Sequence, residues 1–291
     1  MRRAAIASVA VSLFLVGIKT FAYFISHSVA MLASLADSAL DLFTSSLSLI
    51  AIRSALTPAD AEHRFGHGKA EPLAGLAQGA FISASALFLA IQAVNRIVVP
   101  EPIDRSLEAL IVMGIAIVCT VGLVLYQRKV IAKTGSLAVE ADHSHYLSDL
   151  ITNMGVVLAL LLSSFLGWTL ADPLIALAVA GVMLFTALGV GRKSFNQLMD
   201  HEMPQEERAR ICRIAQNHPA VKNVHDLKTR TAGRSTFIQL HLGLDPNMSL
   251  AEAHAVSDAV ERALLQTYPG VEVIIHQDPA GLEPLPEGLP P

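Results

Sequence analysis

The chain has 291 residues, of which 53% are hydrophobic and only 16% are charged, a composition that argues against an ordinary water-soluble protein. A formal net charge of −4 argues against a nucleic-acid partner, because contacts with phosphates favour a basic surface. The two cysteines, Cys119 in an apolar run and Cys212 in a polar segment, argue against a disulfide framework or a thiolate metal cluster. Any metal chemistry must therefore use histidine and carboxylate side chains.

Apolar runs dominate the first two thirds of the chain. A helix needs roughly 17–25 apolar residues to cross a bilayer, and six runs approach or reach that length: 4–25, 30–52, 73–97, 106–127, 138–163 and 170–191. They predict an all-α, six-helix transmembrane bundle over residues 1–195. The first run lacks the small-residue cleavage pattern of a signal peptide and carries Lys19 late in its course. We therefore interpret it as a retained helix whose lysine snorkels to the outer surface.

The charges between the runs predict how the bundle is oriented. Most of the basic residues fall on one side: Arg2, Arg3, Arg53, Arg64, Lys69, Arg128, Lys129, Lys133, Arg192 and Lys193. The other side has two arginines offset by three acids: Arg96, Arg105, Glu101, Asp104 and Glu108. By the positive-inside rule, both termini are expected in the cytoplasm.

Residues 200–280 have the pattern of a small α+β domain. Pro204 and the acids after it predict a helix to about residue 217, and two strands over 221–231 and 236–244 flank a turn at Gly233. Ser249 and Glu252 form a capping-box pattern that opens a helix to about residue 268. A short strand over 272–276 completes an αββαβ order, similar to a ferredoxin-like half-fold with helices on one face. The Pro- and Gly-rich tail, 281–291, is expected to be disordered.

Two pairs of ionisable residues lie inside apolar runs. Asp37 and Asp41 are four residues apart, as are His145 and Asp149, so each pair lies on one face of its helix. Charges at the bilayer centre cost at least ~2.5–3.5 kcal/mol and are normally functional. Together these four residues predict a tetrahedral pocket for a divalent cation. The alternatives are polar stripes that only join helices, or an aspartate paired with lysine, but Lys19 is expected too near the outer end to reach them.

Two further groups of metal-ligand residues lie outside the apolar runs. Asp60, His63 and His67 share a glycine-containing loop and form a candidate site, although loop histidines are often inert. In the α+β domain, a carboxylate accompanies four histidines, a set that favours a metal cluster, with a binuclear site bridged by the carboxylate as one form of it: His225, His241, His254, His276 and Asp278. A lone histidine on a sheet is usually structural. His201 and His218 have no such partners and are expected at the surface.

Four motifs give the chain a resemblance to a known family. Residues 34–41 (SLADSALD), 64–71 (RFGHGKAE), 140–149 (EADHSHYLSD), and 237–242 (FIQLHL) with 274–279 (IIHQDP) occur in this order over about residues 4–280. The sequence resembles the cation diffusion facilitator family, in particular its bacterial zinc/iron efflux branch. The sequence departs from the family pattern at His201, where a basic residue is expected. The connection between the fifth and sixth helices also differs in length by about one residue.

The resemblance implies a homodimeric antiporter, not an enzyme, that exchanges a cytoplasmic divalent cation for protons across the bacterial inner membrane. It implies that Asp37, Asp41, His145 and Asp149 form the transport site, and that the loop residues form a second site. The C-terminal histidines and Asp278 would hold a structural binuclear Zn²⁺ site that joins two copies, and Lys69 and Asp200 would form a charge pair at the dimer interface. Zn²⁺ is also the expected substrate, with Cd²⁺, Fe²⁺ and Co²⁺ as further candidates.

Alternatives from other classes stay open at this point. An intramembrane metalloenzyme would also place histidine and aspartate in helices, but no His-Glu-x-x-His pattern occurs. A metal sensor would use the soluble histidines and leave the buried aspartates unexplained. A channel could line its pore with charged helices.

Overall fold

The computed structural model describes the backbone of all residues except 27–28, 99–106, 167–169, 234, 269 and 282–291. The chain divides into two compact units, Met1–Asn196 and Gln197–Pro291, here called the helical unit and the C-terminal unit. The expected charges at Glu101, Asp104 and Arg105 lie outside the described residues, as does the side chain of Glu108. The expected tail, apart from Gly281, also lies outside them.

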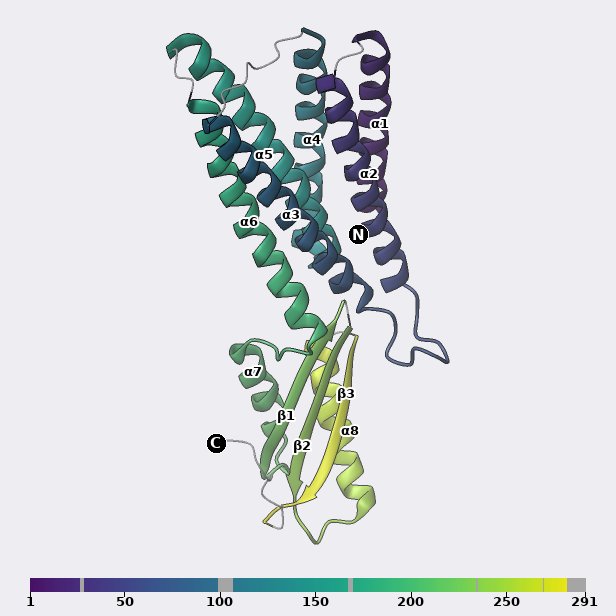
Figure 1. Cartoon of the computed structure of the whole chain (residues 1–291). Helices are drawn as coiled ribbons and strands as arrows, with labels where there is room; N and C mark the ends of the chain where they lie inside the picture. The colour runs from purple at the N-terminus through teal and green to yellow at the C-terminus, as the bar shows by residue number, and fades with distance from the viewer. Residues whose placement is uncertain (27–28, 99–106, 167–169, 234, 269, 282–291) are drawn as a thin grey trace. The chain divides into compact units, whose positions relative to one another are not determined.

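The helical unit contains six long helices (Figure 1), in agreement with the six apolar runs: α1 (Arg2–Ser26), α2 (Val29–Ala55), α3 (Ala70–Val98), α4 (Leu107–Thr134), α5 (Leu137–Leu166) and α6 (Ala171–Leu198). α4 and α6 continue seven residues past their predicted ends, because lysine, arginine and glutamine favour helix although they interrupt the apolar pattern. Gly135, with φ +59°, follows the end of α4 in the left-handed conformation that glycine adopts most readily.

Four of the helices, within the described residues, are long and apolar enough to cross a membrane: Arg2–Ile25, Ala70–Val98, Ile111–Thr134 and Pro173–Leu198. α2 is less apolar because it carries Asp37 and Asp41, whereas the side chains of residues 156–166 of α5 lie outside the described residues. The described residues thus form six long helices, four of which qualify as spans. Large side chains such as Phe21 and Phe185 are 69% and 82% exposed, as expected for surfaces that face lipid.

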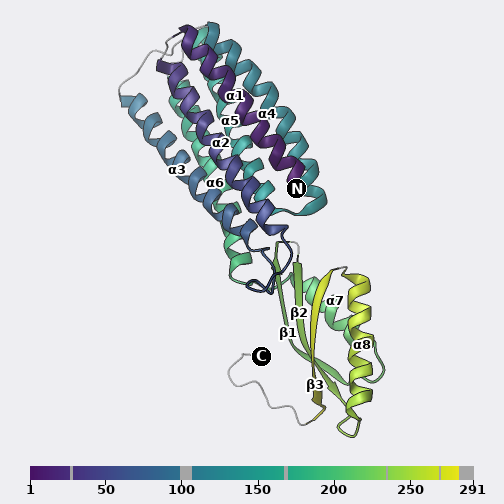
Figure 2. The ribbon, with the colours of Figure 1, turned by 90° about the vertical axis from the view of Figure 1, so that its right-hand side faces the viewer.

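α5 packs against several other helices of this unit (Figure 2). It contacts α3 and α4 most extensively and also α2, while α1 packs along α2 and α4. α3 and α6 approach each other at Gly79, where a Cβ atom would lie 3.2 Å from the carbonyl oxygen of Ala187 and 3.4 Å from the Cα of Gly191. Such close approach of small residues is the usual way in which membrane helices associate.

The C-terminal unit has the predicted αββαβ order: α7 (Gln205–Gln216), β1 (Asn223–Ala232), β2 (Ser235–Leu244), α8 (Leu250–Thr267) and β3 (Val271–Pro279). The strands lie in the order β1-β2-β3, with β1 and β2 antiparallel and β2 and β3 parallel. Ser249 and Glu252 form the predicted capping box at the start of α8. β3 extends three residues past its predicted end, because its last residues pair with Leu242, Gly243 and Leu244.

The two faces of the sheet differ in chemistry. Ile238, Leu240 and Leu242 of β2 are fully or almost fully buried against a core that includes Ile211 of α7 and Leu264 of α8. Because side chains alternate along a strand, His241 points to the opposite face. Both helices contribute to the same core, so the sheet is covered on one face within the chain.

Candidate metal sites

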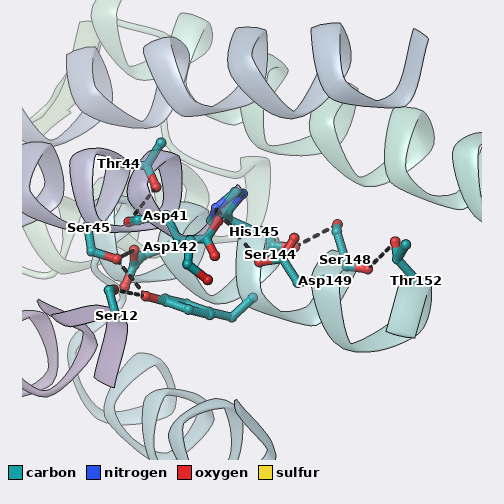
Figure 3. A network of polar contacts seen from close by, with 12 residues as sticks. Ser12, Asp41, Thr44, Ser45, Asp142, Ser144, His145, Ser148, Asp149 and Thr152 are labelled. Carbon is teal, nitrogen blue, oxygen red and sulfur yellow. Dashed lines mark hydrogen bonds and ion pairs between the residues drawn. The ribbon is translucent and has the colours of Figure 1, made fainter. Parts of the chain in front are cut away.

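Three of the four predicted transport residues come together inside the helical unit. The Nε2 atom of His145 lies 3.0 Å from Oδ1 of Asp41 and 3.8 Å from Oδ2 of Asp149. Ligand atoms of all three residues lie within 4.8 Å of one another. Asp41 and His145 are both 7% exposed, and Figure 3 shows them pointing toward each other from α2 and α5. The i,i+4 spacing predicted on α5 thus delivers two ligand atoms to one point.

Asp37 lies one turn away from Asp41 on α2 and lines the same cavity. This cavity has a volume of about 640 Å³ and is bordered by α2, α3, α5 and α6. Besides the four predicted residues, it is lined by polar side chains of the later parts of α3 and α5, including Gln92 and Asn153. All four candidate ligands therefore face one space, although the tight group contains only three of them.

Asp142 belongs to a separate polar network, although it shares the polar face of α5. Its carboxylate accepts hydrogen bonds from Ser45 Oγ at 3.1 Å and from Gln127 Nε2 at 2.8 Å. The hydroxyl of Tyr146 lies 2.5 Å from Ser12 Oγ and 2.9 Å from Ser45 Oγ. This network joins α1, α2, α4 and α5 beside the candidate metal ligands (Figure 3).

The predicted snorkelling of Lys19 is wrong. Its side chain is buried, and the ammonium group donates hydrogen bonds to the carbonyl oxygen of Ser34 at 3.1 Å and to Ser38 Oγ at 2.6 Å. Both acceptors lie on α2, on either side of Asp37 in sequence. A buried ammonium needs such partners to replace water, and α2 supplies them within the bundle, so the side chain has no need to reach the surface.

The loop residues also form a compact group. Asp60 lies 3.4 Å from His63 Nδ1 through one carboxylate oxygen and 3.4 Å from His67 Nε2 through the other. The backbone N–H groups of His63 and Glu62 donate to Asp60 and lower its pKa below the ordinary value. Gly66, with φ +76°, allows the tight turn between the two histidines. The site is exposed, as expected for a loop.

The sheet register assembles the third group. His225 lies opposite His241, and His241 opposite His276, across the three strands. One oxygen of Asp278 lies 3.1 Å from His225 Nε2 and 2.8 Å from His241 Nδ1, while the other lies 3.2 Å from His276 Nε2. Burial alone would raise the pKa of Asp278, but the hydrogen bond from His241 and the nearby imidazoles lower it below the ordinary value. Ligand atoms of His225, His241 and Asp278 lie within 4.8 Å of one another, so these three residues could hold a metal ion.

His254 lies apart from this group within the chain. It belongs to α8, on the covered side of the sheet, where its side chain is 71% exposed and lies 3.7 Å from Asp258.

Asp226, which the sequence prediction did not include, lies 3.6 Å from His241 Nε2. An irregularity in β1 after His225 and a positive φ of 45° at Asp226 bring it there. Its signal in the sequence is an acid next to a candidate ligand.

The predicted pairing of Lys69 with Asp200 involves the two different units and stays a prediction. Within the C-terminal unit, Asp200 lies 3.7 Å from Arg230 Nη1 and has a positive φ of 54°.

Comparisons with known proteins cover nearly the whole chain. Residues 5–199 match the family model described as the cation efflux transmembrane domain, and residues 203–280 match the cation efflux protein cytoplasmic domain. The chain is 45% identical over 282 residues to the cation-efflux pumps FieF of Klebsiella pneumoniae, Citrobacter koseri and Salmonella newport. Each alignment covers 97% of this chain and 94% of the relative.

Solved structures match the C-terminal part. The zinc form of the transporter CzrB is 39% identical over 30% of this chain and 99% of its own, with a TM-score of 0.28. The metal-bound C-terminal domain of CzcD from Thermotoga maritima is 27% identical over 28% of this chain and 100% of its own, with a TM-score of 0.26. With both family models matched in order and relatives aligned almost end to end, the chain belongs to the cation diffusion facilitator family of multi-pass cation efflux transporters.

Proposed function

We propose that the protein exports divalent metal cations by exchanging them for protons, with Asp37, Asp41, His145 and Asp149 as the transport site. The observation that carries this proposal is the group of Asp41, His145 and Asp149, buried or half-buried between α2 and α5 and open to one cavity. A structural polar stripe would need only one hydrogen bond per residue, whereas here three ligand atoms converge.

Proton coupling follows from the chemistry of these ligands. A metal ion binds the neutral imidazole of His145 and ionised carboxylates, so binding releases protons and protonation releases the ion. Metal and protons therefore compete for the same atoms, which makes one-for-one exchange by alternating access the simplest mechanism.

The packing around the group supports access from one side at a time. The cavity extends along the C-terminal halves of α3 and α5, which lie on the outer side if both termini are cytoplasmic. Toward the N-terminal half of α3, buried Gln78 donates to the carbonyl oxygen of Thr44 at 3.3 Å and to the hydroxyl of Ser48. We interpret this polar layer as the inner closure of the site.

The donor set favours Zn²⁺. One imidazole and three carboxylates suit tetrahedral Zn²⁺ and also tolerate Cd²⁺, Fe²⁺ and Co²⁺, so cellular availability decides among them.

The C-terminal unit is proposed to join two copies in a homodimer at the bacterial inner membrane. His225, His241, His276 and Asp278 would hold Zn²⁺ on the sheet face that α7 and α8 leave uncovered within the chain. Because His254 lies apart from them, it can complete that site only from a second copy. The charge pair of Lys69 and Asp200 would likewise form between copies.

Flux through reconstituted protein tests the transport site. In proteoliposomes with an outward-directed Zn²⁺ gradient, Asp41→Ala should reduce flux to the level of empty vesicles, since it removes the ligand nearest His145. Asp60→Ala, which alters the exposed loop site, should keep most of the flux. Wild-type flux should saturate with Zn²⁺ and rise with an opposing proton gradient. Flux that neither saturates nor responds to that gradient would indicate a channel, and unchanged flux in Asp41→Ala would rule out this site.

A further inference from the structure

Lys19 is the only buried lysine or arginine among the side chains that the structure describes. Its ammonium group is held between α1 and α2 by two neutral acceptors, the carbonyl oxygen of Ser34 and the hydroxyl of Ser38. Neutral acceptors fix the position of a positive charge without cancelling it. A membrane protein retains such a charge only at considerable cost, so a functional reason is expected.

The charge of Lys19 acts on the transport site. Ser38 follows Asp37 directly, and the ammonium interacts electrostatically with the carboxylates of both Asp37 and Asp149. Because the side chain of Lys19 is buried, solvent screens its charge less than it would screen an exposed one. Lys19 is therefore a fixed positive charge close to the candidate ligands without replacing any of them.

The charges of the occupied site need such a group. Asp37, Asp41 and Asp149 contribute three negative charges when ionised, and a divalent cation with neutral His145 cancels two of them. One negative charge is left inside the bundle, and Lys19 matches it. The occupied site is then neutral as a whole, which lowers the cost of moving it through a conformational change inside the membrane.

We propose, on the basis of the transport site proposed above, that Lys19 is a built-in counter-cation of that site. It balances the third carboxylate when the metal ion is bound, and by repelling the ion it weakens binding enough for release.

Binding measurements with three variants separate this role from a merely structural link between α1 and α2. Lys19→Met removes the charge and the hydrogen bonds, Lys19→Gln removes the charge but keeps a donor, and Lys19→Arg keeps both. Zn²⁺ binding to the full-length protein is measured by equilibrium dialysis in alkaline buffer, where protons compete little. The transport-site component is the binding lost when Asp41→Asn is added to each protein.

Lys19→Met and Lys19→Gln should bind Zn²⁺ at this component at least about tenfold more tightly than wild type, because a repulsive charge has been removed. Their Zn²⁺ flux should be slower, since release is impaired, while Lys19→Arg should stay close to wild type in both measurements. Unchanged or weaker binding in Lys19→Gln would overturn the counter-cation role and leave a structural link. Wild-type protein with no Asp41-dependent binding would instead overturn the transport site itself.

Discussion

The imidazole of His145 contacts carboxylates from two helices, and this shared contact is the chemical centre of the helical unit. Asp41 approaches its Nε2 atom from α2, and Asp149 approaches the same atom from the next turn of α5. A ring nitrogen placed between two carboxylates can exchange a proton for a metal ion without moving far. The arrangement therefore suits ligand atoms that bind a metal ion and protons in turn.

The spacing of ionisable residues predicted this group, but it did not predict the roles of their neighbours. Asp142 and Lys19 are both charged residues in apolar runs, and the sequence does not show how their roles differ. In the structure, Asp142 belongs to a hydrogen-bond network between helices, whereas the ammonium group of Lys19 lies beside Asp37. The sequence gives each residue's face on its own helix. Which helix lies opposite depends on packing between α1, α2, α4 and α5, which the one-dimensional pattern does not contain.

The network around Asp142 should contribute to stability. Asp142→Ala leaves Ser45 and Gln127 without their buried acceptor, at an expected cost of about 2–3 kcal/mol. Thermal unfolding in detergent checks this, with Thr186→Val on the exposed part of α6 as the control. If both variants unfold at the wild-type temperature, the network does not hold the helices together.

The lengths of the apolar runs predicted the helices well, because each helix must present an apolar surface to lipid. It predicted their ends poorly, since polar residues continue α4 and α6 beyond the apolar stretch. In the C-terminal unit, turn and capping residues predicted the element order, whereas strand register, which aligns the three histidines, could not be predicted. The register of β1 against β2 shifts at an irregularity after His225, and β3 pairs with β2 only after the intervening α8. The pattern of apolar and turn residues encodes neither feature.

The contact between α3 and α6 depends on glycine. Gly79→Leu would force a side chain against Ala187 and Gly191 and separate the two helices, which both line the cavity. We expect a large loss of Zn²⁺ flux and a lower unfolding temperature. Gly114→Leu, at a position of α4 with open space around it, should change little. Because leucine favours helix more than glycine does, helix propensity would not lower stability in either variant. Comparable losses in both variants would therefore mean that close approach at Gly79 does not explain the effect.

At the scale of the whole molecule, the chain combines a unit that matches a cation efflux transmembrane domain with a second unit that has its own candidate metal site. The two sites differ in chemistry: one has three carboxylates and one imidazole, and the other has one central carboxylate and three imidazoles. A set rich in imidazole suits a Zn²⁺ ion that stays bound. A set rich in carboxylate, which protons can neutralise, suits an ion that must leave.

Removing the metal should therefore weaken the dimer. Treating the full-length protein with a chelator is expected to raise the fraction of single copies measured by mass photometry at low protein concentration, and His241→Ala should do the same without chelator. His218→Ala serves as a control, because the imidazole of His218 accepts a hydrogen bond from the nearby backbone N–H of Ala220 and lies outside the three groups of candidate metal ligands. A dimer fraction unaffected by chelator would contradict the proposal that the metal stabilises the dimer.

The alternation of side chains along β2 links the hydrophobic core of the C-terminal unit to its candidate metal site. Ile238, Leu240 and Leu242 enter the core while His241 points to the other face, so a slip of one residue would expose the core and misalign the histidines together. If Zn²⁺ binds there as proposed, its binding would depend on the same strand pairing that buries the core. A copy with a misaligned sheet would then lack both a closed core and a complete metal site.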